Sequence, residues 1–174
     1  MRDAGKISAR EREGEKMSAL KFDEKSTCCF TGHRILGKNF DPAEVRAKIE
    51  DLIKNGYKTF LSGMALGFDT VCFKILVEIK KSCDIRLIAC VPCNSQSKFF
   101  NKKQREEYEE LLKKADEVVN VSDDYYDGCM MVRNYFMVDN SSVIIAYLNY
   151  NRGGTYRTVK YAAENGKEII YVGK

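Results

Sequence analysis

Three glycine-bearing loops carry the residues best suited to ligand chemistry. The longest spans residues 61–69 (LSGMALGFD), after a β-type run and before an apolar helical run. A strand that ends in small residues and then opens a helix offers free N–H groups and a partial positive charge to an anion. Gly63 and Gly67 can adopt positive φ and let a ligand approach the backbone. This loop predicts a phosphate site, whose assigned residues are Ser62, Gly63, Met64, Gly67 and Asp69.

Two shorter loops, residues 31–34 (TGHR) and 152–155 (RGGT), also follow predicted strands. His33 is the single histidine of the chain and suits phosphate contact or acid–base chemistry near neutral pH, with a hydrogen-bonded loop histidine as the alternative. Arg34 suits bidentate phosphate binding, with a surface salt bridge as the alternative. These loops add Thr31, Gly32, His33, Arg34, Gly153, Gly154 and Thr155 to the candidate site.

A predicted helix over residues 129–140 adds Arg133, Asn134 and Asp139 to the candidate site. Arg133 shares a helix face with Met137, so its cation is expected beside buried surface. Such a cation needs a partner, either a ligand phosphate or Asp139; an internal ion pair is the alternative. Asp69 is open to two interpretations as well: an acid favoured by the helix dipole, or a hydrogen-bond partner for a sugar hydroxyl or a nearby loop.

Alternating strands and helices must position these loops. Strands are predicted at residues 26–30, 57–61, 85–91, 117–121, 142–148 and 168–172. Helices are predicted at about 42–54, 70–82, 102–114, 129–140 and 154–165. This alternation predicts an α/β fold: a Rossmann-like, doubly wound, mostly parallel sheet of about six strands with helices on both faces. Ligands bind such sheets beyond the carboxyl ends of the strands, where all three loops should meet.

Length and composition limit the number of domains, the kind of ligand and the cellular compartment to be expected. The 174 residues fit one domain, residues 26–174, after a charged extension at 1–25 that is predicted to be flexible. The net charge of +4 suits an anionic small ligand and does not demand nucleic acid. No apolar run approaches the roughly 18 residues of a membrane span, so no membrane partner is expected. Seven cysteines without a secretion signal favour free thiols in a reducing cytoplasm.

No metal site is expected. Cys90 and Cys93 form a CxxC, but a zinc site needs about four ligands and there is no second such pair. The tyrosine-bearing loop at residues 123–127 suits either stacking on a base or a subunit contact, so a homo-oligomer is left open.

The motifs together resemble the SLOG superfamily, most closely its YpsA-like branch. The resemblance rests on residues 31–34, 62–69, Arg133-Asn134 with residues 137–139, and the GGT at 153–155. The segment at 62–69 also resembles the DNA-processing Smf/DprA proteins. The resemblance implies a Rossmann-like fold with a pocket for a nucleotide or nucleotide-derived ligand, in which Gly63, Met64 and Gly67 lie against phosphate. Residues 31–34 and 153–155 would line the same pocket.

One departure bears on catalysis. The superfamily's LOG enzymes, which also carry an arginine where this chain has Arg133, hydrolyse cytokinin-type nucleotides. Their motif Pro-Gly-Gly-x-Gly-Thr-x-x-Glu ends in a catalytic glutamate. This chain reads RGGTYRT at 152–158, with Thr158 where the glutamate would fall. Losing a catalytic carboxylate costs orders of magnitude in rate, so whether this chain is an enzyme is left open.

Three hypotheses follow. The first is a cytoplasmic protein that binds a nucleotide or nucleotide-derived ligand, with no other cofactor, as a sensor or a regulatory module. The second is an N-glycosidase or phosphoribohydrolase acting on a nucleoside monophosphate, with Glu164, Asp69 or Asp139 in place of the missing glutamate. The third is single-stranded DNA binding in the manner of Smf/DprA proteins, which the near-neutral folded part disfavours.

Overall fold

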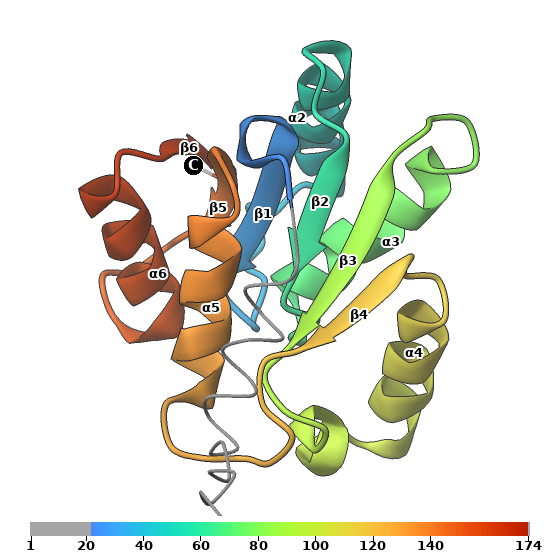
Figure 1. Cartoon of the computed structure of the whole chain (residues 1–174), viewed down its shortest axis with the longest axis vertical. Helices are drawn as coiled ribbons and strands as arrows, with labels where there is room; N and C mark the ends of the chain where they lie inside the picture. The colour runs from blue at the N-terminus through green and yellow to red at the C-terminus, as the bar shows by residue number, and fades with distance from the viewer. Residues whose placement is uncertain (1–21, 174) are drawn as a thin grey trace, which may run out of the picture.

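A computed structural model describes residues 22–173 and contains one six-stranded, all-parallel sheet (Figure 1). The strands are β1 (Thr27–Gly32), β2 (Thr59–Ser62), β3 (Arg86–Val91), β4 (Glu117–Asn120), β5 (Val143–Tyr147) and β6 (Glu168–Tyr171). The helices are α2 (Pro42–Lys54), α3 (Phe68–Ile79), α4 (Lys102–Leu112), α5 (Cys129–Asp139) and α6 (Gly153–Glu164), with short 3-10 turns η1 (Glu24–Ser26) and η2 (Gln96–Phe99). The predicted α/β fold is confirmed.

The sheet order is β4-β3-β2-β1-β5-β6, so the order of the strands reverses at β1. Cys29 of β1 pairs with Leu61 of β2 on one side and with Ile144 of β5 on the other. Chain segments far apart in sequence therefore meet at the carboxyl end of β1. In doubly wound sheets this reversal point is where ligands bind.

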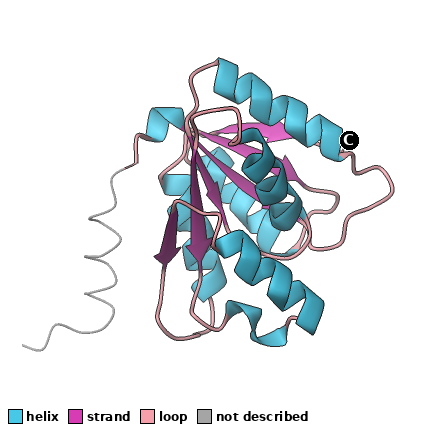
Figure 2. Ribbon diagram, turned by 90° about the vertical axis from the view of Figure 1, so that its right-hand side faces the viewer, coloured by secondary structure: helices cyan, strands magenta, loops and turns pink. Residues whose placement is uncertain are grey.

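Helices lie on both faces of the sheet (Figure 2). A core of buried side chains lies on each face. Alternation along β1 sends Cys28 and Phe30 to the face covered by α2, α3 and α4, and Cys29 to the face covered by α5 and α6. The strands carry apolar side chains on both faces, as buried parallel strands do. Cys29 and Met137 both belong to the second of these cores.

Local signals set the ends of the helices. The Asp41 side chain accepts a hydrogen bond from the Ala43 N–H at 2.9 Å, and Pro42 occupies the first turn of α2. Helix α4 begins with a capping box in which Asn101 and Gln104 bond each other's backbone. Helix α2 is followed by Gly56 at φ 91°, a conformation that glycine adopts without strain.

The structure differs from the sequence prediction at several element ends near the site; β2 continues to Ser62, and α3 begins at Phe68 instead of residue 70. Strand β1 continues through Thr31 and Gly32, which pair with Ala146 and Tyr147 of β5, instead of ending at Phe30. The predicted polar link before α4 contains the 3-10 turn η2. Of the predicted extension at 1–25, residues 1–21 lie outside the described part, while Phe22 packs edge-on against Phe136.

Within residues 22–173, no helix has the length and apolar character needed to cross a membrane. Over the same residues, no three His, Cys, Asp or Glu side chains are grouped so that they could hold a metal ion.

Candidate functional site

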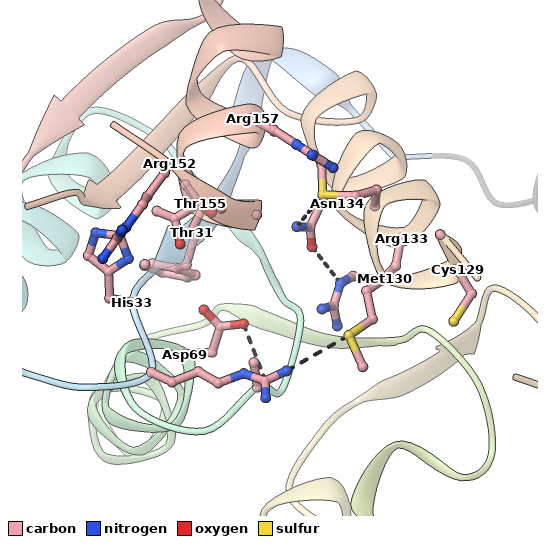
Figure 3. A pocket seen from close by; sticks show the side chains of 18 of the residues that line it. Thr31, His33, Asp69, Cys129, Met130, Arg133, Asn134, Arg152, Thr155 and Arg157 are labelled. Carbon is pink, nitrogen blue, oxygen red and sulfur yellow. Dashed lines mark hydrogen bonds between the residues drawn. The ribbon is translucent and has the colours of Figure 1, made fainter. Parts of the chain in front are cut away.

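A cavity of about 640 Å³ lies where β1, the loop before α3, and the first turns of α5 and α6 meet (Figure 3). It brings together ten of the predicted site residues: Thr31, Gly32, His33, Arg34, Asp69, Arg133, Asn134, Gly153, Gly154 and Thr155. Figure 3 shows side chains from these separate elements directed toward one shared space.

The remaining predicted residues do not line this cavity. Ser62, Gly63, Met64 and Gly67 are absent from its walls. Asp139 is exposed at the end of α5, where it accepts a hydrogen bond from the Tyr161 hydroxyl at 2.8 Å. It lies six positions after Arg133, which places it about 120° around the helix from Arg133.

The glycines of the 61–69 loop make room for other protein segments. A Cβ on Gly63 would lie 2.8 Å from Cζ of Arg133 and 2.9 Å from Oδ2 of Asp69. A Cβ on Gly67 would lie 2.2 Å from the carbonyl oxygen of Arg34. Of the two glycines expected to adopt positive φ, Gly67 does (83°) and Gly63 does not; Met64, for which it was not expected, has a φ of 55°. These glycines therefore let the charged side chains and the 33–34 segment pack closely behind the cavity.

Arg133 is buried and held by the backbone. Its Nη1 donates hydrogen bonds to the carbonyl oxygens of Gly63 and, at 3.1 Å, Cys90. Its Nε donates to Oδ1 of Asn134 at 2.7 Å. The expected pairing with Asp139 is not formed. Burial lowers the pKa of Arg133, while the nearby charge of Asp69 acts in the opposite direction.

Asp69 is a buried carboxylate, 6% exposed, in the first turn of α3. Burial raises the pKa of Asp69 to about 6, against the lowering effect of Arg133, the Ala65 N–H and Arg34. Its Oδ2 accepts a hydrogen bond from the Ala65 N–H at 3.3 Å. Among residues 22–173 no ion pair to Asp69 is formed. The carboxylate is therefore ionised at neutral pH and only partly satisfied by the protein.

The contacts of the His33 ring favour its neutral form with the proton on Nδ1. Its Nε2 accepts a hydrogen bond from the Asn149 N–H at 3.0 Å, and its ring stacks on Tyr150 with centroids 3.8 Å apart. Because Nε2 accepts, the neutral ring carries its proton on Nδ1. Burial lowers the pKa of His33, which favours this neutral form.

Two helices begin at the cavity. The N-termini of α5 and α6, at Gly128 and Arg152, have no side-chain cap. Their first N–H groups and the positive ends of their dipoles favour an anion there. The side chains that line the cavity include four arginines against two aspartates, which adds to this positive field.

The lining residues that were not assigned from the sequence are Phe30, Ile35, Ala65, Tyr125, Asp127, Gly128, Cys129, Met130, Met131, Tyr150, Arg152 and Arg157. Arg157 follows Gly153 by four residues, so one helical face carries both, and this spacing was a usable signal. Cys129, Met130 and Met131 lie in the first turn of α5, a predicted helix whose orientation the sequence does not specify, and most of the others come from loops.

Thr158, at the position where LOG enzymes carry the catalytic glutamate, is held inside the protein by hydrogen bonds. Thr158 is buried; its hydroxyl donates to the Gly154 carbonyl oxygen at 2.8 Å and accepts from Nδ2 of Asn134 at 3.0 Å. Of the three carboxylates considered as replacements, Glu164 lies at the far end of α6 beside Lys160, and Asp139 is outside the cavity. Asp69 alone of the three lines it.

The parallel six-stranded sheet, with its basic cavity at the reversal of strand order, defines a Rossmann-like α/β protein. The family model for YpsA, described as the YspA SLOG family, matches residues 42–171. The chain belongs to this family.

Relatives of known sequence agree with that assignment. The SPbeta prophage-derived protein YoqJ of Bacillus subtilis (strain 168) is 31% identical over 131 residues, covering 67% of this chain and 76% of YoqJ. A UPF0398 protein of Bacillus thuringiensis (strain Al Hakam) is 23% identical over 128 residues, covering 72% of this chain and 70% of that protein.

Two solved structures share the fold. DNA processing protein A from Streptococcus pneumoniae superposes with a TM-score of 0.62 at 16% identity, over 90% of this chain and 51% of that one. The chain thus spans about half the length of that protein. The Helicobacter pylori protein, whose structure concerns its single-stranded DNA binding mode, gives 0.63 at 16% identity, over 90% and 67%.

Proposed function

We propose that the cavity binds a nucleotide or nucleotide-derived ligand, with its phosphate at the first turn of α6. The observation that carries the proposal is the uncapped start of α6 at Arg152-Gly153-Gly154, with Arg157 one turn further along the same cavity wall. A phosphate there accepts backbone N–H bonds, gains from the helix dipole and pairs with guanidinium groups.

The surroundings support an anionic ligand over a neutral one. Arg152 and Arg157 are exposed at the cavity and are free of the internal carbonyl bonds that occupy Arg133. Arg34 contacts the Met130 sulfur through Nη2 at 3.8 Å, a weak interaction that a ligand oxygen can replace. Three of the four arginines are thus available for charge-assisted hydrogen bonds.

We assign a sensing or regulatory role to this binding in preference to catalysis. Thr158 fills the position where LOG enzymes carry the glutamate, and its hydroxyl is committed to the backbone and Asn134. Hydrolysis of an N-glycoside would have to use Asp69, the one replacement carboxylate at the cavity. Release of free base from a bound nucleoside monophosphate, lost in Asp69→Asn, would establish the enzymatic alternative.

Single-stranded DNA is the second candidate ligand. The H. pylori structural neighbour binds it, and this cavity has exposed apolar side chains at its mouth: Ile35, Tyr125 and Tyr150. Aromatic side chains beside basic groups stack bases without regard to sequence. Binding to an oligothymidylate that falls steeply with salt would support this candidate.

The test is a thermal-shift and calorimetric screen of nucleotides with a matched pair of variants. A ligand at 100 times its Kd stabilises a protein by about 2.7 kcal/mol, which is several degrees for a domain of this size. Arg157→Ala should weaken nucleotide binding by about tenfold, the scale of one charge-assisted hydrogen bond. Lys160→Ala, on the same helix outside the cavity, should leave binding unchanged. The absence of any shift, or an equal affinity in Arg157→Ala, would contradict the proposal.

A further inference from the structure

Three polar side chains at the cavity are more than nine-tenths buried and retain an atom with no protein partner. Thr31 and His33 are each 5% exposed and Asp69 is 6% exposed. Across residues 22–173, no hydrogen bond is formed by Oγ1 of Thr31, Nδ1 of His33 or Oδ1 of Asp69. The single side-chain polar atom of residues 22–173 that is both sealed in the protein and without a partner is Oγ of Ser141, so the three atoms are reached from the cavity that their residues line. A molecule bound in the cavity can therefore supply their hydrogen-bond partners.

The fold directs these three groups into one place. Thr31 lies near the end of β1 and His33 directly after it, and both residues line the cavity. Asp69 enters from the first turn of α3, and the absence of a side chain at Gly63 lets its carboxylate and the Arg133 guanidinium pack against the Gly63 backbone. Figure 3 shows Thr31, His33 and Asp69 among the side chains directed into the cavity.

The hydrogen-bonding character of these three side chains favours an uncharged group as their partner. The Asp69 carboxylate only accepts, the neutral His33 ring donates through Nδ1–H, and the Thr31 hydroxyl does either. A phosphate would suit His33 but would be repelled by Asp69. An ammonium would suit Asp69 but would meet the donor of His33 and the cation of Arg133. Neighbouring hydroxyl groups, which donate and accept without charge, satisfy all three.

We propose that Thr31, His33 and Asp69 form a subsite for a vicinal diol, the ribose 2′- and 3′-hydroxyls of the nucleotide. The proposal rests on the nucleotide binding proposed above and adds its sugar selectivity. One ribose hydroxyl donates to Oδ1 of Asp69, and its neighbour accepts from Nδ1–H of His33. The cavity therefore favours ribonucleotides over 2′-deoxynucleotides and disfavours DNA.

The test compares each ribonucleoside 5′-monophosphate that binds with its 2′-deoxy counterpart by isothermal titration calorimetry. The hydroxyl lost from the charged acceptor should weaken binding of the deoxy form by about tenfold to a hundredfold. Asp69→Asn should weaken the ribonucleotide and bring the ratio of the two affinities close to one. Asp139→Asn, the same change at an exposed carboxylate outside the cavity, should keep the wild-type ratio.

A second variant protects the test against misfolding. Thr31→Val preserves the shape of a strand residue and should lower ribonucleotide affinity more than deoxynucleotide affinity. Equal affinities of the two forms for the wild-type protein, or a wild-type ratio in both Asp69→Asn and Thr31→Val, would overturn the diol subsite while leaving nucleotide binding intact. Failure of every nucleotide to bind would instead overturn the proposed function, and the subsite with it.

Discussion

Replacing Asp69 by Asn should stabilise the protein at neutral pH. The folded state holds the pKa of Asp69 at about 6, chiefly because the carboxylate is buried, against an ordinary value of 3.8. Each pKa unit corresponds to about 1.4 kcal/mol, so the ionised carboxylate costs the folded state up to about 3 kcal/mol relative to the protonated one. Asn resembles the protonated form and avoids this cost.

Proton binding sets the direction in which pH changes the free energy of unfolding. Between pH 3.8 and about 6 the folded state holds the Asp69 proton and the unfolded state has lost it, so stability falls as pH rises through this window. The gain from Asp69→Asn should therefore be small at pH 3.5 and approach its full value at pH 7.

The assay is urea unfolding of wild type and Asp69→Asn at both pH values in matched buffers. The difference between the two proteins cancels the titration of all other groups, provided that the slope of each transition is unchanged. A difference in unfolding free energy that is the same at pH 3.5 and pH 7 would refute the reasoning, because it would mean that burial does not penalise this charge.

Three further predictions test other contacts of the site. Gly63→Ala places a Cβ 2.8 Å from Arg133 and should destabilise the protein by about 1–3 kcal/mol in thermal unfolding, whereas Gly154→Ala, whose nearest contact is at 3.8 Å, should change stability by under about 0.5 kcal/mol. His33 should give one set of ¹⁵N resonances at pH 7 with the proton on Nδ1; a proton on Nε2 would break the bond from the Asn149 N–H. Thr158→Glu should cost more than about 3 kcal/mol of stability and should not create hydrolase activity, because it buries a charge and removes two hydrogen bonds; a stable, active variant would contradict this.

The fold was predictable because each unit carries its own local signals. Apolar runs of strand length alternate with helices that begin at caps such as Asp41 and end before Asn-Gly pairs such as Asn165-Gly166. The meeting of the glycine loops also follows from topology, since the carboxyl ends of parallel strands share one edge. The extra length of β1 was not predictable, because it depends on pairing with β5, a partner more than a hundred residues away.

The site was only partly predictable for a related reason. Sequence motifs located the loops but not the direction of each side chain. Gly63 and Gly67 were expected to face a ligand, yet their missing side chains accommodate Arg133 and the Arg34 backbone. The tyrosine-bearing loop had two interpretations, and the structure places Tyr125 at the cavity wall. Tertiary packing decides such orientations.

The reversal of strand order at β1 has a consequence for the order in which the molecule is made. Strand β1 pairs with β2 early in the chain, but its other neighbour β5 is synthesised near the end, and the His33–Asn149 hydrogen bond joins residues 116 positions apart. During translation, the first half of the cavity therefore exists without its second half. Ligand binding should begin only once β5 and α6 have left the ribosome, so that it acts on the last step of assembly.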